Sequence, residues 1–236
     1  MGSPAPEIPT ATLDSTDRAR RTGRSPLTAR WRVYLARPAG RIELAVTAAM
    51  FGAVLLAVPR FLAWNEARPG VVLADPILAR LPVLDVSWPI FVIFYGGLTL
   101  ALMDLVPRPW RLLAGLRAYA LLMTFRMVGM WVTPLAPDPS NIPLRDPFVE
   151  LIASGGQVFT KDLFFSGHTS TAALFALVAL HPLRKRVLYV GTALVGLLVL
   201  LQAVHYSVDV FAAPFFALGA WRLGKSWPAD QPGRTE

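Results

Sequence analysis

Two of the chain's three histidines lie near an aspartate or at the edge of an apolar run, where acid–base or nucleophilic chemistry would need them. His205 precedes Asp209 by four residues, and His168 begins an earlier apolar stretch. On a helix, residues 205 and 209 share a face, so the carboxylate can hold one imidazole nitrogen while the other points outward as a nucleophile or base. Because polar groups are costly at a bilayer, this placement calls for a functional explanation.

The residues just ahead of His168 fit a phosphate-binding helix start. Asp162, Ser166 and Gly167 precede it. The amides and dipole at a helix N-terminus favour phosphate oxygens, and a serine followed by a glycine lets the backbone come close to such a group. We therefore expect Asp162, Ser166 and Gly167 to contact substrate. The residues leave open that Asp162 is an exposed loop acid or a helix cap, and that Ser166 and Thr169 form an N-cap pair.

Arg126 is the other polar outlier, because it lies midway along the apolar stretch 118–135, where a buried charge is costly. One interpretation is a clamp that reaches a substrate phosphate. The alternative is a structural partner of Asp104 or Tyr119 on a neighbouring helix. We favour the clamp, whereas His181, next to Pro182, is interpreted as a solvated or capping residue.

Membrane helices must position these residues. The chain is 54% hydrophobic and 16% charged, and its mean hydropathy is +0.48, which is typical of an integral membrane protein. It has no cysteine, so a disulfide and a thiolate metal site are excluded. The formal charge of +8 reflects basic residues that mostly flank apolar runs. That pattern indicates membrane orientation rather than nucleic-acid binding.

Six apolar segments predict the fold class: all-α, an integral membrane six-helix bundle with cytoplasmic termini. The segments are 42–64, 88–106, 112–135, 168–181, 187–203 and 205–223. Since a membrane helix needs about 20 residues, the fourth is short unless Phe164 and Phe165 extend it. The expected domains are a disordered basic cytoplasmic tail over 1–41, a six-helix membrane catalytic domain over 42–223, and a cytoplasmic tail over 224–236.

Basic residues predict how the helices are oriented. The N-terminal tail, the 107–111 connection, the 183–186 turn and the 222–225 segment carry the positive charge on one side, which the positive-inside rule makes cytoplasmic. The His168 and His205 helix ends then meet at the exoplasmic surface. The excess of arginine over lysine is typical of a GC-rich genome. We therefore expect a multi-pass protein of a bacterial inner membrane, with its active site facing the periplasm or exterior.

The two motifs together resemble one family. Ser-Gly-His-Thr at 166–169, with Asp162 four residues before its serine, and His-Tyr-Ser-Val-Asp-Val at 205–210 look like the sphingomyelin synthase-like branch of the type-2 phosphatidic acid phosphatase superfamily. The resemblance covers roughly residues 40–223 in helix count and order. It implies a catalytic set of His168, His205 and Asp209, and it matches Asp162 to the acid ahead of the first motif.

The sequence departs from that family where the reaction type is concerned. Thr160-Lys161 stands where Cys-Gly commonly precedes the acid, and the Lys-x6-Arg-Pro element of the phosphatase branch is not found. Gln202-Ala203-Val204 stands where an arginine motif of that branch would lead into the last histidine region. These departures favour the transferase-like branch.

The residues and the resemblance predict a membrane lipid phosphotransferase. His205, aligned by Asp209, would attack a lipid phosphorus and form a phosphohistidine, while His168 would give a proton to the leaving alkoxide and take one from the acceptor. Membrane lipids would be donor and acceptor, and no metal, cofactor or nucleic acid is expected. The alternatives are a lipid phosphate phosphatase that uses water as acceptor at the same site, and a non-enzymatic membrane scaffold or transporter.

Overall fold

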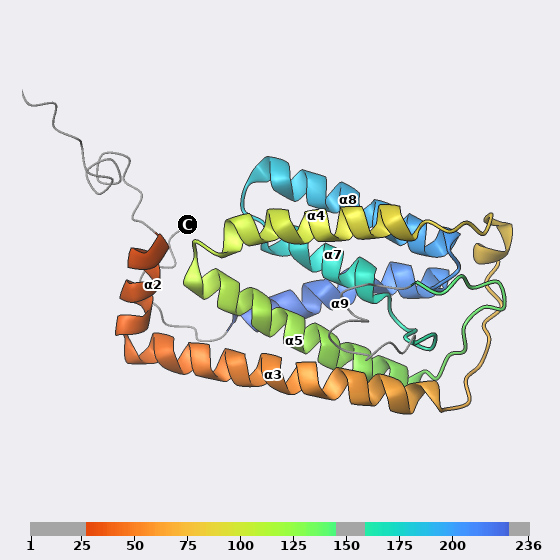
Figure 1. Ribbon diagram of the computed structural model, residues 1–236, viewed down its shortest axis with the longest axis horizontal. Helices are drawn as coiled ribbons and strands as arrows, with labels where there is room; N and C mark the ends of the chain where they lie inside the picture. Colours follow the sequence, from red (N-terminus) through yellow and green to blue (C-terminus); the bar gives the residue numbers. More distant parts are fainter. Residues whose placement is uncertain (1–26, 145–158, 227–236) are drawn as a thin grey trace, which may run out of the picture.

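The computed structural model describes residues 27–144 and 159–226, in which helices are joined by loops (Figure 1). The helices are α2 (Leu27–Ala36), α3 (Pro38–Glu66), α4 (Ser87–Leu105), α5 (Pro109–Val132), α7 (Gly167–Val178), α8 (Pro182–Leu201) and α9 (Ser207–Lys225), with one 3-10 turn, η1 (Leu78–Arg80). Outside the helices, the described part of the chain has one isolated bridge, between Val71 and Leu135. The predicted all-α class is confirmed.

Helix α2 corrects part of the predicted N-terminal tail. Residues 27–41, expected to be disordered, form α2 and the first residues of α3. The Arg30 guanidinium donates to the Pro107 carbonyl at 3.4 Å, and the Trp31 indole donates to the Val106 carbonyl at 3.0 Å. These bonds join α2 to the α4–α5 connection across the end of the bundle, and a local reading of composition cannot detect them. The tail predictions for 1–26 and 227–236 lie outside the described residues.

Three of the described helices are long and apolar enough to cross a membrane: α3, α4 and α5. The prediction of six spanning helices therefore has direct support for these three and stays a prediction for α7, α8 and α9. Helix α7 has 12 residues, so at 1.5 Å per residue it is about 18 Å long. Phe164 and Phe165 do not extend this helix, because α7 begins only at Gly167, so the fourth segment is short.

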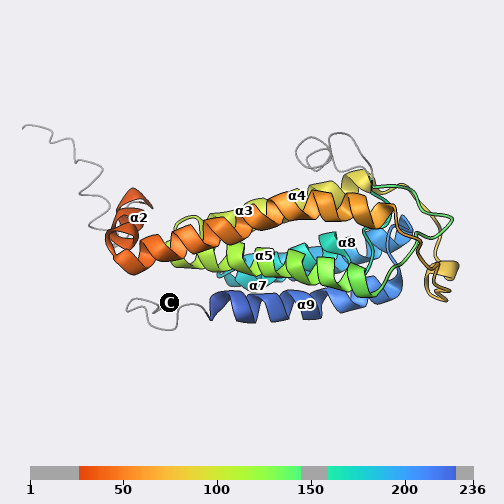
Figure 2. The same cartoon turned by 90° about the horizontal axis from the view of Figure 1, so that it is seen from below.

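Small residues let the central helices pack closely. Helix α5 packs on α3 and α9, α7 packs on α8 and α9, and α4 packs on α7 and α8. Figure 2 shows α3 and α4 on one face of the bundle and α9 on the opposite face. A Cβ added at Gly224 would lie 2.7 Å from the Ala118 nitrogen, so α5 and α9 are in backbone contact there. Close approach at small residues is a typical means of helix association in membranes.

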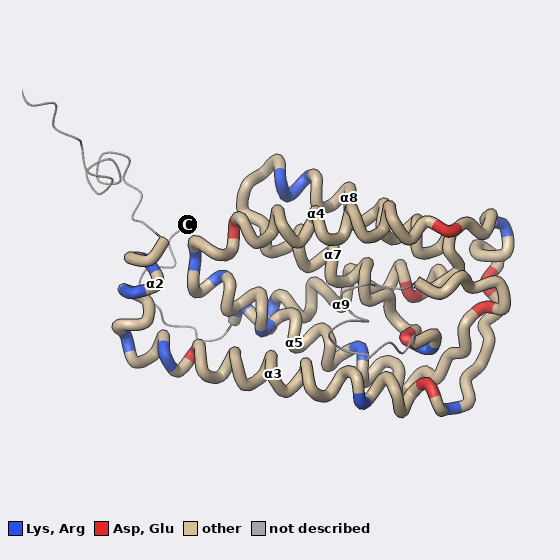
Figure 3. Tube along the Cα trace, in the orientation of Figure 1, with Lys and Arg blue, Asp and Glu red and all other residues tan. Residues whose placement is uncertain are grey.

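The two ends of the bundle differ in charge. Figure 3 shows lysine and arginine gathered near α2 and the first turn of α8, and acids mixed with bases in the loops at the opposite end. Near the basic end, the buried Arg117 and Glu43 form an ion pair at 2.7 Å, and Arg117 also donates to the Gly224 carbonyl at 3.1 Å. The opposite end, where acids and bases are mixed in the loops, carries both histidine motifs.

Candidate active site

Ser166 starts α7 and places His168 in its first turn. The Ser166 hydroxyl accepts from the Thr169 amide at 3.3 Å and from the Thr169 hydroxyl at 3.0 Å. The N-cap alternative for Ser166 and Thr169 is therefore confirmed. A serine cap satisfies one of the unpaired amides at a helix start, and it leaves the first-turn residues Gly167 and His168 partly exposed.

The His205–Asp209 contact is made, but not in the way that the spacing suggested. Helix α9 begins at Ser207 with Tyr206 as its N-cap, so His205 lies ahead of the helix and the premise of a shared helical face is wrong. Instead, the side chain of Asp209, in the first turn of α9, points toward the residues that precede the helix. Its Oδ2 accepts from the Tyr206 amide at 3.2 Å and lies 3.4 Å from His205 Nδ1.

The Asp209 carboxylate is fully buried, with 0% of its side chain exposed. Its other oxygen, Oδ1, has no hydrogen-bond partner among the described residues. A buried carboxylate is costly unless opposite charge compensates it, and the positive end of the α9 dipole contributes such compensation. This pair is therefore suited to stabilise positive charge as it develops on the imidazole.

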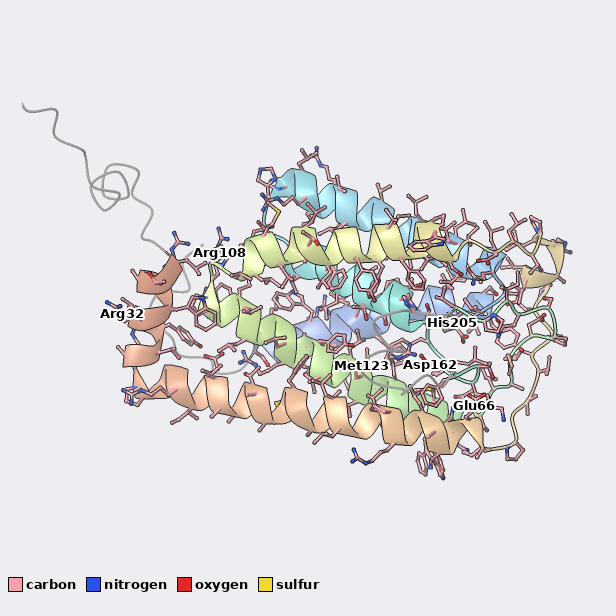
Figure 4. The ribbon with its side chains drawn as sticks, in the orientation of Figure 1. Arg32, Glu66, Arg108, Met123, Asp162 and His205 are labelled. Carbon is pink, nitrogen blue, oxygen red and sulfur yellow. The ribbon has the colours of Figure 1, made fainter. Side chains whose placement is uncertain are left out.

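One backbone bond ties the two motifs together. The Ser166 amide donates to the Asp209 carbonyl oxygen at 3.1 Å, which joins the N-terminus of α7 to the N-terminus of α9. Helix α8 closes in from the side at Gly196, where an added Cβ would lie 2.9 Å from the Val210 side chain. Figure 4 shows His205 and Asp162 near the same end of the bundle, far from Arg32 and Arg108.

Aromatic side chains of α4 hold the His168 ring. The ring centroid lies 5.1 Å from that of Phe94, in an edge-to-face arrangement at 64°, and 6.4 Å from that of Phe91. Such edge-to-face pairs fix ring orientation and exclude water from one face. Helix α4 thus orients the second histidine.

Arg126 contacts the segment that leads into His168. Its buried guanidinium forms an ion pair with Asp162 and donates to the Phe165 carbonyl. It also lies against Gly167, where a Cβ would come within 2.8 Å of its Cζ. A side chain at position 167 would shift the guanidinium away from this position. Arg126 therefore contacts two of the other three residues predicted to bind substrate, Asp162 and Gly167.

The structural partners that the sequence suggested for Arg126 are wrong. Asp104 forms an ion pair with Arg184 at 2.6 Å and accepts from the amides at the α7–α8 turn. Tyr119 packs against Phe51, with ring centroids 5.9 Å apart. The acidic partner is Asp162, which is a loop acid with a side chain 39% exposed that forms an ion pair with Arg126.

Asp75 is a site residue that sequence reasoning missed. Its Oδ2 accepts from the Ser207 amide at 2.6 Å, and its Oδ1 accepts from the amides of Ile77 and Leu78, so it caps α9 from a distant loop. Burial raises the pKa of Asp75, but the bonds from Ser207, Leu78 and Ile77 outweigh burial and hold that pKa below its ordinary value. The pair Asp75-Pro76 is a turn signal; nothing local links it to α9.

Tyr206 joins two loops beneath the site. Its hydroxyl donates to the Ala136 carbonyl at 2.8 Å and accepts from the Leu73 amide at 3.2 Å. Burial is the main cause that raises the pKa of Tyr206, with nearby carboxylates adding to the effect. The phenol therefore stays a hydrogen-bond donor across the physiological range.

The loops into both motifs are held in unusual backbone conformations. Phe164 has φ 51° and Ala203 has φ 55°, and each stands two residues before a motif, ahead of Ser166 and His205 respectively. Left-handed conformations cost a non-glycine residue free energy and persist where the surroundings over-determine them. In the segment before Phe164, Lys161 donates to the carbonyls of Glu66 at 2.8 Å and Arg68 at 2.5 Å at the end of α3.

Comparison with known proteins supports a family for the part of the chain that holds both motifs. Residues 161–226 match the family model described as PAP2 superfamily C-terminal. No match was found among curated proteins. The matched segment contains α7, α8 and α9 and, with them, Asp162, His168, His205 and Asp209. The match supports the type-2 phosphatidic acid phosphatase superfamily, which is made up of phosphatases and phosphotransferases.

Proposed function

We propose that this chain is a membrane lipid phosphotransferase of the sphingomyelin synthase-like kind, which moves a phospho-headgroup between lipids through a phosphohistidine. The observation that carries the proposal is the bond from the Ser166 amide to the Asp209 carbonyl at 3.1 Å, because it brings the two histidine motifs to one place. The catalytic part is residues 42–223, in a bacterial inner membrane, with the site at the exoplasmic leaflet.

His205 is the nucleophile in the first step. Its Nδ1 faces Asp209 Oδ2 at 3.4 Å, so the lone pair on Nε2 is the one directed to substrate. Nε2 attacks the phosphorus of the donor lipid, and the bond from phosphorus to the leaving lipid oxygen breaks. Protonated His168 gives its proton to that oxygen, and a phosphohistidine remains.

The second step reverses the proton transfer. Neutral His168 takes the proton of the acceptor hydroxyl, and the acceptor oxygen attacks phosphorus. The phosphorus–nitrogen bond breaks and its electron pair returns to His205 Nε2. A lipid alcohol as acceptor gives a new phospholipid, whereas water gives hydrolysis, so the phosphatase alternative differs only in the acceptor. The missing Lys-x6-Arg-Pro element favours transfer.

The N-terminus of α7 and Arg126 supply the positive potential for phosphate oxygens. Helix amides and their dipole favour an anion at this position, and the Arg126 guanidinium lies directly against Gly167. In this role Asp162 positions the guanidinium, and Arg126 clamps the phosphate. Such preorganised charge is often the largest contribution to catalysis.

Product identification tests the proposal. Purified protein is incubated with labelled phosphatidylcholine, phosphatidylethanolamine, phosphatidylinositol or phosphatidic acid, each with and without ceramide or diacylglycerol, and products are identified by mass spectrometry. We expect a new phospholipid only when a lipid alcohol is present, and none from His205→Ala. Headgroup release without an acceptor would establish the phosphatase alternative, and absence of turnover with every donor would leave the scaffold or transporter.

A further inference from the structure

An open groove runs between the outward faces of α4 and α8. Its volume is about 460 Å³, within the range of about 300–1,000 Å³ that small-molecule sites occupy. Its walls come from Val92, Ile93 and Leu100 on α4 and from Val190 and Leu194 on α8, and none of His168, His205 and Asp209 lines it. Val92 is 68% exposed and Val190 60% exposed, so the groove opens to the outside of the bundle.

Three glycines give the groove its depth, in two different ways. A Cβ added at Gly97 would lie 3.3 Å from Leu188, and one at Gly191 would lie 3.3 Å from Ile93, so these two let α4 and α8 approach each other. A Cβ at Gly96 would meet nothing within 4 Å. Gly96 therefore leaves space that no protein atom fills.

A cation stands among the otherwise apolar residues that line this groove. Arg186, the fifth residue of α8, is one of the lining residues and is exposed. Arg184, two residues earlier, is bonded to Asp104, but Arg186 forms no ion pair within residues 27–144 and 159–226. Lys185 adds a second positive charge beside it.

We infer that the groove between α4 and α8 binds an anionic phospholipid, with an acyl chain along Gly96 and the phosphate at Arg186. Helix α4 is long and apolar enough to span a membrane, so its exposed face meets acyl chains. An apolar channel with an arginine among its lining residues is complementary to a lipid with a negative headgroup, and basic pockets between membrane helices bind such headgroups. This site is separate from the histidines and independent of their reaction.

Lipid retention tests the inference. The full chain is purified in detergent, and retained phosphatidylglycerol or phosphatidylcholine of identical acyl chains is measured by native mass spectrometry. The His205→Ala background is used so that lipid turned over at the histidines does not count. We expect preferential retention of phosphatidylglycerol. Arg186→Gln should weaken its binding about fivefold, the effect of one basic residue near a membrane surface, and Arg60→Gln on α3 should not.

A substitution that fills the groove distinguishes binding of the acyl chain from attraction of the headgroup to surface charge. Gly96→Leu should weaken phosphatidylglycerol binding by at least tenfold, because the new side chain occupies the acyl channel from a position where an added Cβ meets nothing within 4 Å. The matched control is Gly52→Leu on α3, where an added Cβ also meets nothing within 4 Å. Equal retention of the two lipids, unchanged binding in Gly96→Leu, or equal losses in both leucine variants would each overturn the inference. So would a dimer that Gly96→Leu dissociates in the absence of lipid, since a second copy would then occupy the groove.

Discussion

Asp209 combines two roles at the scale of a single residue. Its Oδ2 accepts from the Tyr206 amide at the start of α9 and faces His205 Nδ1. One carboxylate thus contacts both the helix start and the His205 imidazole. Because Asp209 bonds to the amide of Tyr206, the residue next to His205, its carboxylate lies close to His205 Nδ1 although His205 is not helical.

We predict that Asp209→Asn lowers kcat by at least about 10²-fold for every substrate, because an amide cannot stabilise the imidazolium and selects the wrong tautomer. Steady-state kinetics with native and activated substrates measures this. The control is Asp85→Asn, which alters another carboxylate that accepts from a helix-start amide, that of Ser87 at 3.1 Å, away from the histidines. An equal loss of kcat in both variants would mean that only helix capping had been tested.

The two histidines should separate kinetically. His205→Ala should abolish both headgroup release and covalent labelling in a protein that still folds. His168→Ala should still cleave a substrate with a nitrophenyl leaving group, which needs no acid, and then accumulate a phosphohistidine because its second step lacks a base. Acid-labile phosphate mapped by peptide mass spectrometry should be on His205. Finding it on His168, or trapping it in His205→Ala, would reverse the assigned roles.

Arg126 is predicted to need its guanidinium, not only its charge. Arg126→Lys should lose most of the activity, since an ammonium cannot bind Asp162, the Phe165 carbonyl and a phosphate with one planar fork. The comparison is the double variant Arg126→Leu with Asp162→Leu, which removes both charges of the ion pair. Turnover near that of the parent protein in this double variant would show that the arginine is only a structural partner.

At the scale of elements, the N-terminus of α9 depends on a carboxylate from a distant loop. Asp75 accepts from the Ser207 amide at 2.6 Å, 132 residues along the chain. Together with the Ser166–Asp209 backbone bond, this contact means that the site is assembled from one loop and two helix starts. Neighbouring residues define each helix start, whereas contacts between distant residues set the position of the two helix starts relative to each other.

Asp75→Asn should reduce the free energy of unfolding by about 1 kcal/mol at pH 7, the usual effect of a lost cap. Because the pKa of Asp75 is lowered in the folded protein, its contribution is complete above the ordinary value of 3.8 and is lost as the pH falls through the folded pKa. The difference between parent and variant should therefore vanish at low pH. Denaturant unfolding in micelles at several pH values measures it; a gap that widened on acidification would refute the linkage. Asp138→Asn, whose carboxylate bonds to Ser140 in its own loop, is the control.

At the scale of the whole molecule, the charge difference between the two ends of the bundle predicts its orientation. Arg184, Lys185 and Arg186 on α8 lie at the opposite end from the histidine motifs, as Arg222 and Lys225 do on α9. Basic residues at helix ends are retained in the cytoplasm. A reporter that is active only outside the membrane should give no signal when fused after residue 236 and a strong signal within 136–144. A reporter that fluoresces only inside should give the reverse pattern, and exchange of the two patterns would place the site in the cytoplasm.

The sequence by itself determined the features that depend on local composition and short spacing. Apolar runs predicted the helical class, and the two motifs singled out His168, His205 and Asp209, because side-chain chemistry and helix-start preferences are properties of neighbouring residues. Even there the geometry differed in detail. Spacing alone put His205 on a helix, whereas the Tyr206 cap starts α9 after it.

Only the tertiary structure decided the contacts between residues far apart in the chain. Arg126 pairs with Asp162, 36 residues away, and not with Asp104, because the segment before α7 folds back against α5. Asp75 accepts a hydrogen bond from the distant Ser207 amide. Helix α2 is held by hydrogen bonds to carbonyls of the α4–α5 connection, although the composition of the α2 segment suggested disorder. The hydrophobic period and the charge count of a segment indicate which of its own residues can be buried. Which distant partner meets a buried charge is set by how the helices pack, and the period of a single segment contains no such information.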